Sequence, residues 1–150
     1  MLLYEPQQYI AEWAGRQLGV KDFGPCAAIG VLRNRELVGA AVFNHFEWPN
    51  IEITFCTSDK RWATPDVVRG IIRYPFLQLG CKRITAVTDD TNQLAIAFLC
   101  RMGFRQEGFH PDASPTGARV SYGLLRKDAE KWLTEDRIVG KQGQFASASA

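Results

Sequence analysis

Two successive strand–helix units constrain the fold more than any other feature of the sequence. Residues 51–57 alternate apolar and polar side chains, as a half-buried strand does, and residues 65–79 follow with apolar side chains at helical spacing. Residues 82–88 predict a second strand, and another apolar helical pattern follows it. A helical crossover returns the chain to the same end of the sheet, so the two strands should be adjacent and parallel. We expect a ligand crevice beyond their carboxyl ends.

Residues with defined roles at helix ends mark the first crossover helix. Thr64 can cap it, and Pro65 takes the first helical position, where its missing N–H is not needed. Gly80 ends this helix, and Pro75 is expected to kink it by deleting one backbone hydrogen bond. The predicted buried face comprises Val68, Ile71, Ile72, Phe76 and Leu79.

The other segments predict further helices and strands. Residues 7–18 indicate an amphipathic helix that Gly19 ends. The second crossover helix has Thr91 or Asn92 as its cap and Gly103 at its end. Its predicted face comprises Leu94, Ala95, Phe98, Leu99 and Met102. We expect the remaining strands at residues 27–32, 36–43, 104–109 and 119–125, with a polar turn at 33–35 and loops without a recognisable specificity code at 23–26, 45–50 and 110–117.

The fold class that follows is α/β (α+β): a mixed, mostly antiparallel sheet of about six strands with helices on both faces. With 150 residues, the chain has the length of one domain, which we place at residues 1–133. Residues 134–150 are polar and are expected to form a frayed C-terminal tail.

Composition argues against several classes of function. A net charge of +2 does not by itself indicate a nucleic-acid or membrane partner, because binding to a polyanion needs a concentrated basic face. The cysteines stand singly, so we expect neither a metal site nor a disulfide framework. The N-terminal segment has no basic region followed by a long apolar run, so no signal peptide is expected. These observations favour a cytoplasmic location.

Four local patterns resemble the GNAT superfamily of acyl-coenzyme A N-acyltransferases, most closely its subgroup that acetylates protein N-termini and its small phage-encoded members. They are Glu52-Ile53 in a strand, Trp62-Ala63-Thr64 opening a helix, Asn92 before the next helix, and Met102-Gly103-Phe104-Arg105-Gln106-Glu107-Gly108. The resemblance spans most of the chain. It implies a GNAT-like sheet with a splayed parallel strand pair, acetyl-coenzyme A (acetyl-CoA) as cofactor, and a small-molecule or peptide amine as acceptor.

The resemblance also implies which residues bind the cofactor. Its diphosphate would meet backbone N–H groups at a helix start and nearby cationic side chains. The residues concerned are Lys60, Arg61, Trp62, Ala63, Thr64 and Arg69. The acyl carbonyl would meet a backbone N–H where the parallel strands diverge, a position that we assign to Phe55, Cys56 and Thr57. Asn92 would contact the pantetheine arm or the adenosine end, and it has an equally good reason to be present as a helix cap.

The cofactor loop departs from the family pattern of Gln or Arg, two residues, Gly, one residue, and Gly or Ala. The equivalent positions are Ser58, Arg61 and Ala63, of which only Ala63 fits. Glycine allows the backbone to approach phosphate closely, so an arginine there must swing aside or replace a backbone contact with its guanidinium.

The main candidates for catalysis are Glu52 and Tyr122. Glu52 is our candidate for the base that takes a proton from the amine, and the alternative is a solvent-facing strand residue. Glu47 is the reserve candidate, and His45 is a weaker one. The tyrosine that many relatives use to protonate the leaving thiolate is replaced by Leu99, and Tyr122 could serve instead unless it is a core residue.

Two other functions remain open from the sequence. One is modification of DNA bases, as in Mom-type phage enzymes, for which Phe46 and Trp48 could form a stacking platform. Its weak support is the locally basic set Arg61, Arg69, Arg73, Lys82 and Arg83. The other is a binding module that kept the fold without the reaction. The sequence leaves the oligomeric state open, including a homodimer, and it predicts no membrane partner.

Overall fold

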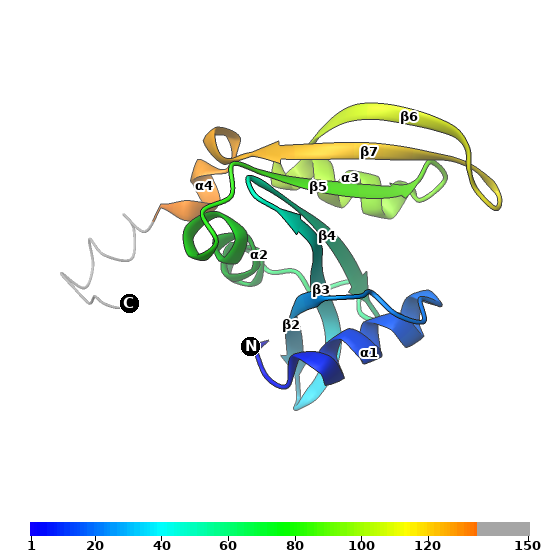
Figure 1. Ribbon diagram of the computed structural model, residues 1–150. Coiled ribbons are helices and arrows are strands. Elements are labelled where there is room, and N and C mark those ends of the chain that lie inside the picture. Colours follow the sequence, from blue (N-terminus) through cyan, green and yellow to red (C-terminus); the bar gives the residue numbers. More distant parts are fainter. Residues whose placement is uncertain (135–150) are drawn as a thin grey trace.

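The computed structural model describes residues 1–134, which form a sheet of seven strands flanked by helices (Figure 1). Along the sheet the strands follow the order β1-β2-β3-β4-β5-β7-β6. The strands are β1 (Leu2–Leu3), β2 (Cys26–Arg33), β3 (Glu36–Glu47), β4 (Asn50–Thr57), β5 (Arg83–Asp89), β6 (Arg105–Ser114) and β7 (Gly117–Leu125). The helices are α1 (Gln7–Leu18), α2 (Pro65–Arg73), α3 (Gln93–Met102) and α4 (Glu130–Leu133), with a π-helical turn at Tyr74–Gln78 and a 3-10 turn at Arg126–Asp128.

The parallel pair that the sequence predicts is confirmed, and it is short. All neighbouring strands are antiparallel except β4 and β5, which pair at three positions, the last being Glu52 opposite Thr85. β4 then stays with β3 as far as Thr57, whereas β5 stays with β7 as far as Asp89. The two strands therefore separate after Glu52, and Figure 1 shows them diverging from a common edge.

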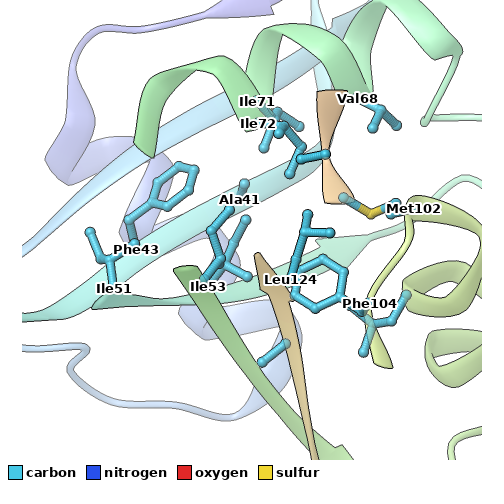
Figure 2. Close-up of a cluster of buried hydrophobic side chains, with 14 of the residues drawn as sticks. Ala41, Phe43, Ile51, Ile53, Val68, Ile71, Ile72, Met102, Phe104 and Leu124 are labelled. Atoms are coloured by element: carbon cyan, nitrogen blue, oxygen red, sulfur yellow. The ribbon is translucent and has the colours of Figure 1, made fainter. Parts of the chain in front are cut away.

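Helices cover the two faces of the sheet unequally. On one face, α1 packs against β2, β3 and β4 in a small cluster formed by Ile10, Ala14, Ala28, Ala40, Val42 and Cys56. On the other face, α2 and α3 pack over the sheet in a larger cluster, part of which is drawn in Figure 2. Side chains alternate along a strand, so Ile51 and Ile53 of β4 belong to the larger cluster, and Glu52 lies between them on the α1 face.

The ends of α2 agree with the sequence signals. The Thr64 hydroxyl accepts a hydrogen bond from the N–H of Val67 (3.3 Å), and Pro65 is the first helical residue. The α-helix ends at Arg73 and continues as the π-helical turn that contains Pro75, where the break was expected. Gly80 then has a positive φ of 69°.

Two expected loops are strands in the structure. β3 continues through Glu47 and β4 begins at Asn50, so only Trp48 and Pro49 connect them. β6 continues to Ser114, well into the segment expected to be a loop. Both extensions carry mostly exposed side chains, so they lack the apolar alternation that marks a strand in sequence. The backbone hydrogen bonds between the strands form in these extensions although the apolar alternation is missing.

The predicted buried face of α3 was partly wrong. Leu99 and Met102 are buried, but the Leu94 side chain is 77% exposed. The apolar spacing continues through the first turn, whereas the hydrophobic cluster reaches only the later turns. Spacing alone therefore overestimated the buried face. The additional strand β1 and helix α4 are short elements that the sequence did not indicate.

The predicted tail at 134–150 lies outside the described residues except for Thr134. In the part of the chain that is described, no helix is long and apolar enough to cross a membrane.

Burial of Cys56 leads to a prediction about alkaline stability. Burial raises the pKa of this thiol from 9.0 to about 11, and it also raises the pKa of Cys81 and Tyr74. A raised folded-state pKa stabilises the fold below the unfolded value and is lost as pH rises through the folded value. We expect the free energy of unfolding to fall between pH 9 and pH 11. In urea titrations, Cys56→Ala should show a shallower fall than the wild type. An equal fall in both proteins would contradict this assignment.

Candidate functional site

The point where β4 and β5 separate is held by side chains that join three strands. Thr85 of β5 donates a hydrogen bond to Asn50 Oδ1 of β4 (2.7 Å) and accepts one from Arg83 Nη1 (2.6 Å). Arg83 also forms an ion pair with Glu107 of β6. This pair crosses β7 at Gly123, where a Cβ atom would overlap both partners. The network fixes the strands on the side where they are still paired.

Glu52 lies at the last paired position, and a histidine holds its carboxylate. His45 Nδ1 is 3.0 Å from Glu52 Oε1. The Glu52 side chain is 41% exposed and the His45 side chain 67% exposed, so solvent reaches both. Two candidates that the sequence gave unequal weight therefore lie together on the α1 face. Glu47, the reserve candidate, is an exposed residue at the end of β3.

An irregularity in β3 brings His45 to this position. The register between β3 and β4 shifts between Asn44 and Glu47, where two residues of β3 lie opposite one residue of β4. His45 has a positive φ of 51°, which is uncommon for a residue other than glycine. The sequence contains a trace of this bulge, because the apolar run of β3 ends at Phe43. That trace does not show which side chain turns toward Glu52.

Three aromatic rings lie at the open part of the strand pair. The ring centroids of Phe55 (β4) and Phe98 (α3) are 5.1 Å apart, and those of Trp62 and Phe98 are 5.5 Å apart. Trp62 is only 6% exposed and packs over Gly39 of β3. Of the predicted cofactor residues, Trp62 therefore cannot present its ring, and its backbone N–H already donates to the Asp59 carbonyl oxygen (3.2 Å). Cys56 faces α1 instead, with its thiol 3.9 Å from the Ala14 carbonyl oxygen.

The loop at residues 58–64 has an internal acidic residue that the sequence analysis overlooked. Asp59 Oδ1 accepts a hydrogen bond from the N–H of Arg61 (2.8 Å), and Asp59 Oδ2 forms an ion pair with Arg33 of β2 (3.2 Å). Arg33 also donates to the Arg61 carbonyl oxygen (2.5 Å). Thr57 Oγ1 accepts from the Asp59 N–H (3.0 Å). Asp59 therefore already occupies one of the amides that an anion could use.

The remaining donors of this loop are available for an anion. Within the described residues, the backbone N–H groups of Lys60, Ala63 and Thr64 make no hydrogen bond. The side chains of Lys60 and Arg61 are exposed, and no ion pair is found for either within residues 1–134. Arg69 is engaged differently, because its Nη1 lies 2.7 Å from Asp66 Oδ1. Amides and cations at the start of a helix suit a diphosphate group.

The other candidates lie on the opposite side of the strand pair from Glu52. Tyr122 of β7 is buried in the larger cluster, and burial together with the Cys100 thiol raises its pKa. Within residues 1–134 its hydroxyl has no hydrogen-bond partner. Leu99 is buried, as expected for a core position. Asn92 caps α3 by accepting a hydrogen bond from the N–H of Ala95 (3.1 Å), so its structural role is confirmed.

A hollow of the described chain lies elsewhere, along α1 and the loop before β2. It has a volume of about 900 Å³ and is lined by residues such as Gln8, Glu12, Arg16 and Phe23. Its rim reaches β3 through Phe23, whose carbonyl oxygen accepts a hydrogen bond from Asn44 (3.1 Å). We place the chemistry at Glu52 and not here, because β4 and β5 separate at Glu52.

The aromatic platform considered for nucleic acid is partly covered. Trp48 donates a hydrogen bond to the Gly80 carbonyl oxygen (3.1 Å), and Lys82 lies over its ring at 5.4 Å. Arg69 and Arg83 are engaged by Asp66 and Glu107. The basic residues that the sequence grouped together therefore do not form a concentrated unpaired face.

Comparison with known proteins identifies the fold. Neither the protein-family models nor the curated proteins contain a match to this sequence. Among solved structures, a GNAT-family acetyltransferase from Bacillus anthracis matches with a TM-score of 0.57 and 20% identity over 67% of this chain. The match covers 66% of that protein, so this chain spans about two thirds of its length.

Two further structures are similar over more of the chain. A variant of the spermidine N-acetyltransferase from Vibrio cholerae has a TM-score of 0.62 and 14% identity, covering 89% of this chain and 81% of that one. An IAA acetyltransferase from Bacillus cereus has a TM-score of 0.67 and 9% identity, covering 83% and 98%. At these low identities the comparisons show that the chain has the fold of GNAT acetyltransferases.

Proposed function

We propose that this protein transfers the acetyl group of acetyl-CoA to a primary amine of a small molecule or a peptide. One observation carries the proposal: β4 and β5 diverge at the carboxylate of Glu52, and the donor-rich loop at residues 58–64 follows the far end of β4. Within residues 1–134, the edge of β4 beyond Glu52 pairs with no other strand on the β5 side. This edge runs from the Glu52 carboxylate to the 58–64 loop, which could bind an anion. When bound, acetyl-CoA would supply a thioester, whose carbonyl carbon is open to attack by an amine.

The residues at both ends of β4 have groups that could bind acetyl-CoA. The unpaired amides of Lys60, Ala63 and Thr64, with the Lys60 and Arg61 side chains, would hold the diphosphate. The β4 edge that faces the divergence, including Phe55–Thr57 as the sequence suggested, would supply backbone donors for the pantetheine arm and the acyl carbonyl. Asn92 would approach the same ligand from the start of α3.

Two side chains, on opposite sides of the reacting carbonyl group, would accept and donate protons. Glu52 would provide the basic group for the ammonium form of the acceptor, because it is a solvent-accessible carboxylate at the point of divergence. Tyr122 would be the proton donor on the core side, since its raised pKa keeps the phenol protonated at neutral pH. The thiolate of coenzyme A can also leave without this help.

The proposal is tested by binding and by transfer. Calorimetric titration with acetyl-CoA should show saturable binding, and mass spectrometry should detect acetylated product from spermidine or from a short peptide with a free N-terminus. Spermidine is chosen because one structural neighbour is a spermidine N-acetyltransferase. No binding at millimolar acetyl-CoA would refute the proposal. Binding without transfer to any amine would favour the alternative of a catalytically silent binding module.

Asp59 gives a prediction about cofactor affinity. Its carboxylate occupies the Arg61 amide and would repel a diphosphate nearby. Asp59→Asn keeps an oxygen acceptor while removing the charge, and it frees the Arg33 guanidinium. We expect acetyl-CoA to bind several-fold more tightly, since one unit-charge repulsion at a protein surface amounts to roughly 1 kcal/mol. Calorimetry checks this, with Asp112→Asn on the distant β6 as the matched control. Weaker binding in Asp59→Asn would mean that the diphosphate does not meet this loop.

A further inference from the structure

We propose that His45 and Glu52 form one basic unit, in which the Glu52 carboxylate positions the imidazole and His45 Nε2 accepts the proton from the acceptor amine. This inference rests on the proposed function and specifies how the site deprotonates its substrate. It exchanges the roles that residue type alone suggests, because the histidine becomes the catalytic residue and the glutamate the positioning residue.

The contact between the two side chains determines which ring nitrogen is available. An ionised carboxylate only accepts hydrogen bonds, so the 3.0 Å contact between Glu52 Oε1 and His45 Nδ1 requires the proton on Nδ1. The hydrogen bond at one nitrogen fixes the tautomer, which leaves the lone pair on Nε2. Within the described residues, Nε2 of His45 has no partner. A base held by a carboxylate in this way follows the general pattern of an oriented histidine.

The backbone supports a functional reading of this contact. His45 sits in the bulge of β3 with a positive φ of 51°, a left-handed conformation that few residues other than glycine adopt and that histidine adopts more readily than most. Bulges next to active sites redirect side chains, and this one directs His45 to the last paired residue of β4.

The chemistry of imidazole also suits the step. An efficient general base at neutral pH has a pKa close to that pH. Among side chains, imidazole is the group that ordinarily changes charge between pH 5 and pH 8. Carboxylic acids titrate well below this range. The charged side chains on neighbouring segments are Glu47 on β3, Asp22 before β2, and Arg83 and Glu107, which pair with each other. Glu52 is the one that contacts the ring.

The ammonium group of the acceptor loses two protons as its nitrogen becomes an amide nitrogen. Nε2 of His45 takes one proton from the ammonium group, and the imidazolium returns it to solvent, which the exposed ring allows. The freed amine forms a bond to the acetyl carbonyl carbon, and the carbon–sulfur bond breaks. The proton that the new amide nitrogen loses is taken up by the departing thiolate. The net products are the acetylated amine, coenzyme A and one proton.

A spectroscopic test needs no substrate. Long-range proton–nitrogen NMR spectra of the imidazoles contain signals from only two histidines, His45 and His110. Neutral His45 should carry its proton on Nδ1 in the wild type and lose this preference in Glu52→Gln. His110, which contacts Ser121 Oγ (3.1 Å), should be unchanged. A neutral His45 with its proton on Nε2 would overturn the inference.

A kinetic test separates this inference from the proposed function. With acetyl-CoA and spermidine or the peptide, His45→Gln should lower kcat/KM at neutral pH on the order of 10²-fold and remove the rise of rate with pH, whereas the Kd for acetyl-CoA stays unchanged. His45→Gln/Glu52→Gln should be no slower than either single variant, since the two act as a unit. The control is His110→Gln. A wild-type pH profile in His45→Gln overturns this inference alone. Absence of acetyl-CoA binding, or of transfer, in the wild type overturns the proposed function and this inference with it.

Discussion

Replacing Glu52 by glutamine is expected to lower kcat for acetyl transfer by on the order of 10²-fold at neutral pH, because the base His45 loses the carboxylate that positions it. Glutamine has nearly the same shape as glutamate, so β4 should keep its pairing with β3 and β5. The variant loses the negative charge at the divergence, and a neutral amide, which can donate as well as accept, replaces the carboxylate that holds His45 Nδ1. Both changes act on proton removal from the amine.

The Glu52→Gln effect should be confined to turnover. The Kd for acetyl-CoA should remain within about twofold of the wild-type value, because the cofactor donors lie at residues 58–64 and on the strand backbone. Glu47→Gln is the matched control, since Glu47 is an exposed glutamate on the same hairpin and should retain nearly full activity. A Glu52→Gln protein with wild-type kcat would remove Glu52 from the mechanism.

Replacing Trp62 by alanine is expected to reduce the free energy of unfolding by about 3–5 kcal/mol, as for other large buried aromatic side chains. The ring fills the space over Gly39 and contacts Phe55 and Phe98, so it ties the 58–64 loop to β3, β4 and α3. The free energy of unfolding of a domain of this size is roughly 5–15 kcal/mol, so the expected loss is a large share of the total stability. Acetyl-CoA affinity should fall with it, because the loop amides lose their support.

Trp48 provides a control with the same chemistry and a different environment. Its side chain is 58% exposed, so Trp48→Ala should lower stability by about 1 kcal/mol, mainly through the lost hydrogen bond to Gly80. Urea unfolding followed by circular dichroism measures both variants. Equal losses for Trp62→Ala and Trp48→Ala would show that the Trp62 ring is not part of the core.

Residue periodicity predicted the fold where side chains face a core. The strand at 51–57 and the helix from Pro65 were placed correctly, because burial imposes alternation on the strand and Thr64 and Pro65 mark the helix start. It failed where the backbone pairs without burial. The end of β3 and the outer half of β6 carry exposed side chains, so only the backbone ladder defines them.

Only part of the candidate site could be proposed from the sequence. Glu52 could be proposed because the Glu52-Ile53 pattern, which contributes to the family resemblance, is local information. Its contact with His45 depends on a bulge, and the blocking of the Arg61 amide depends on how Asp59 turns within its loop. The parallel strands also separate directly after Glu52, before the Phe55–Thr57 segment that the sequence analysis assigned to the acyl carbonyl. Contacts between loops and distant strands leave no periodic trace in a single sequence.

We propose that acetyl-CoA lies between β4 and β5 with its diphosphate on the 58–64 loop. The direct test is titration of the labelled protein with acetyl-CoA, followed by backbone amide NMR. We expect saturable shifts for Lys60, Ala63 and Thr64 together with residues of β4 beyond Glu52. Shifts confined to the hollow along α1, around Glu12 and Phe23, or no shifts at millimolar ligand, would contradict this proposal.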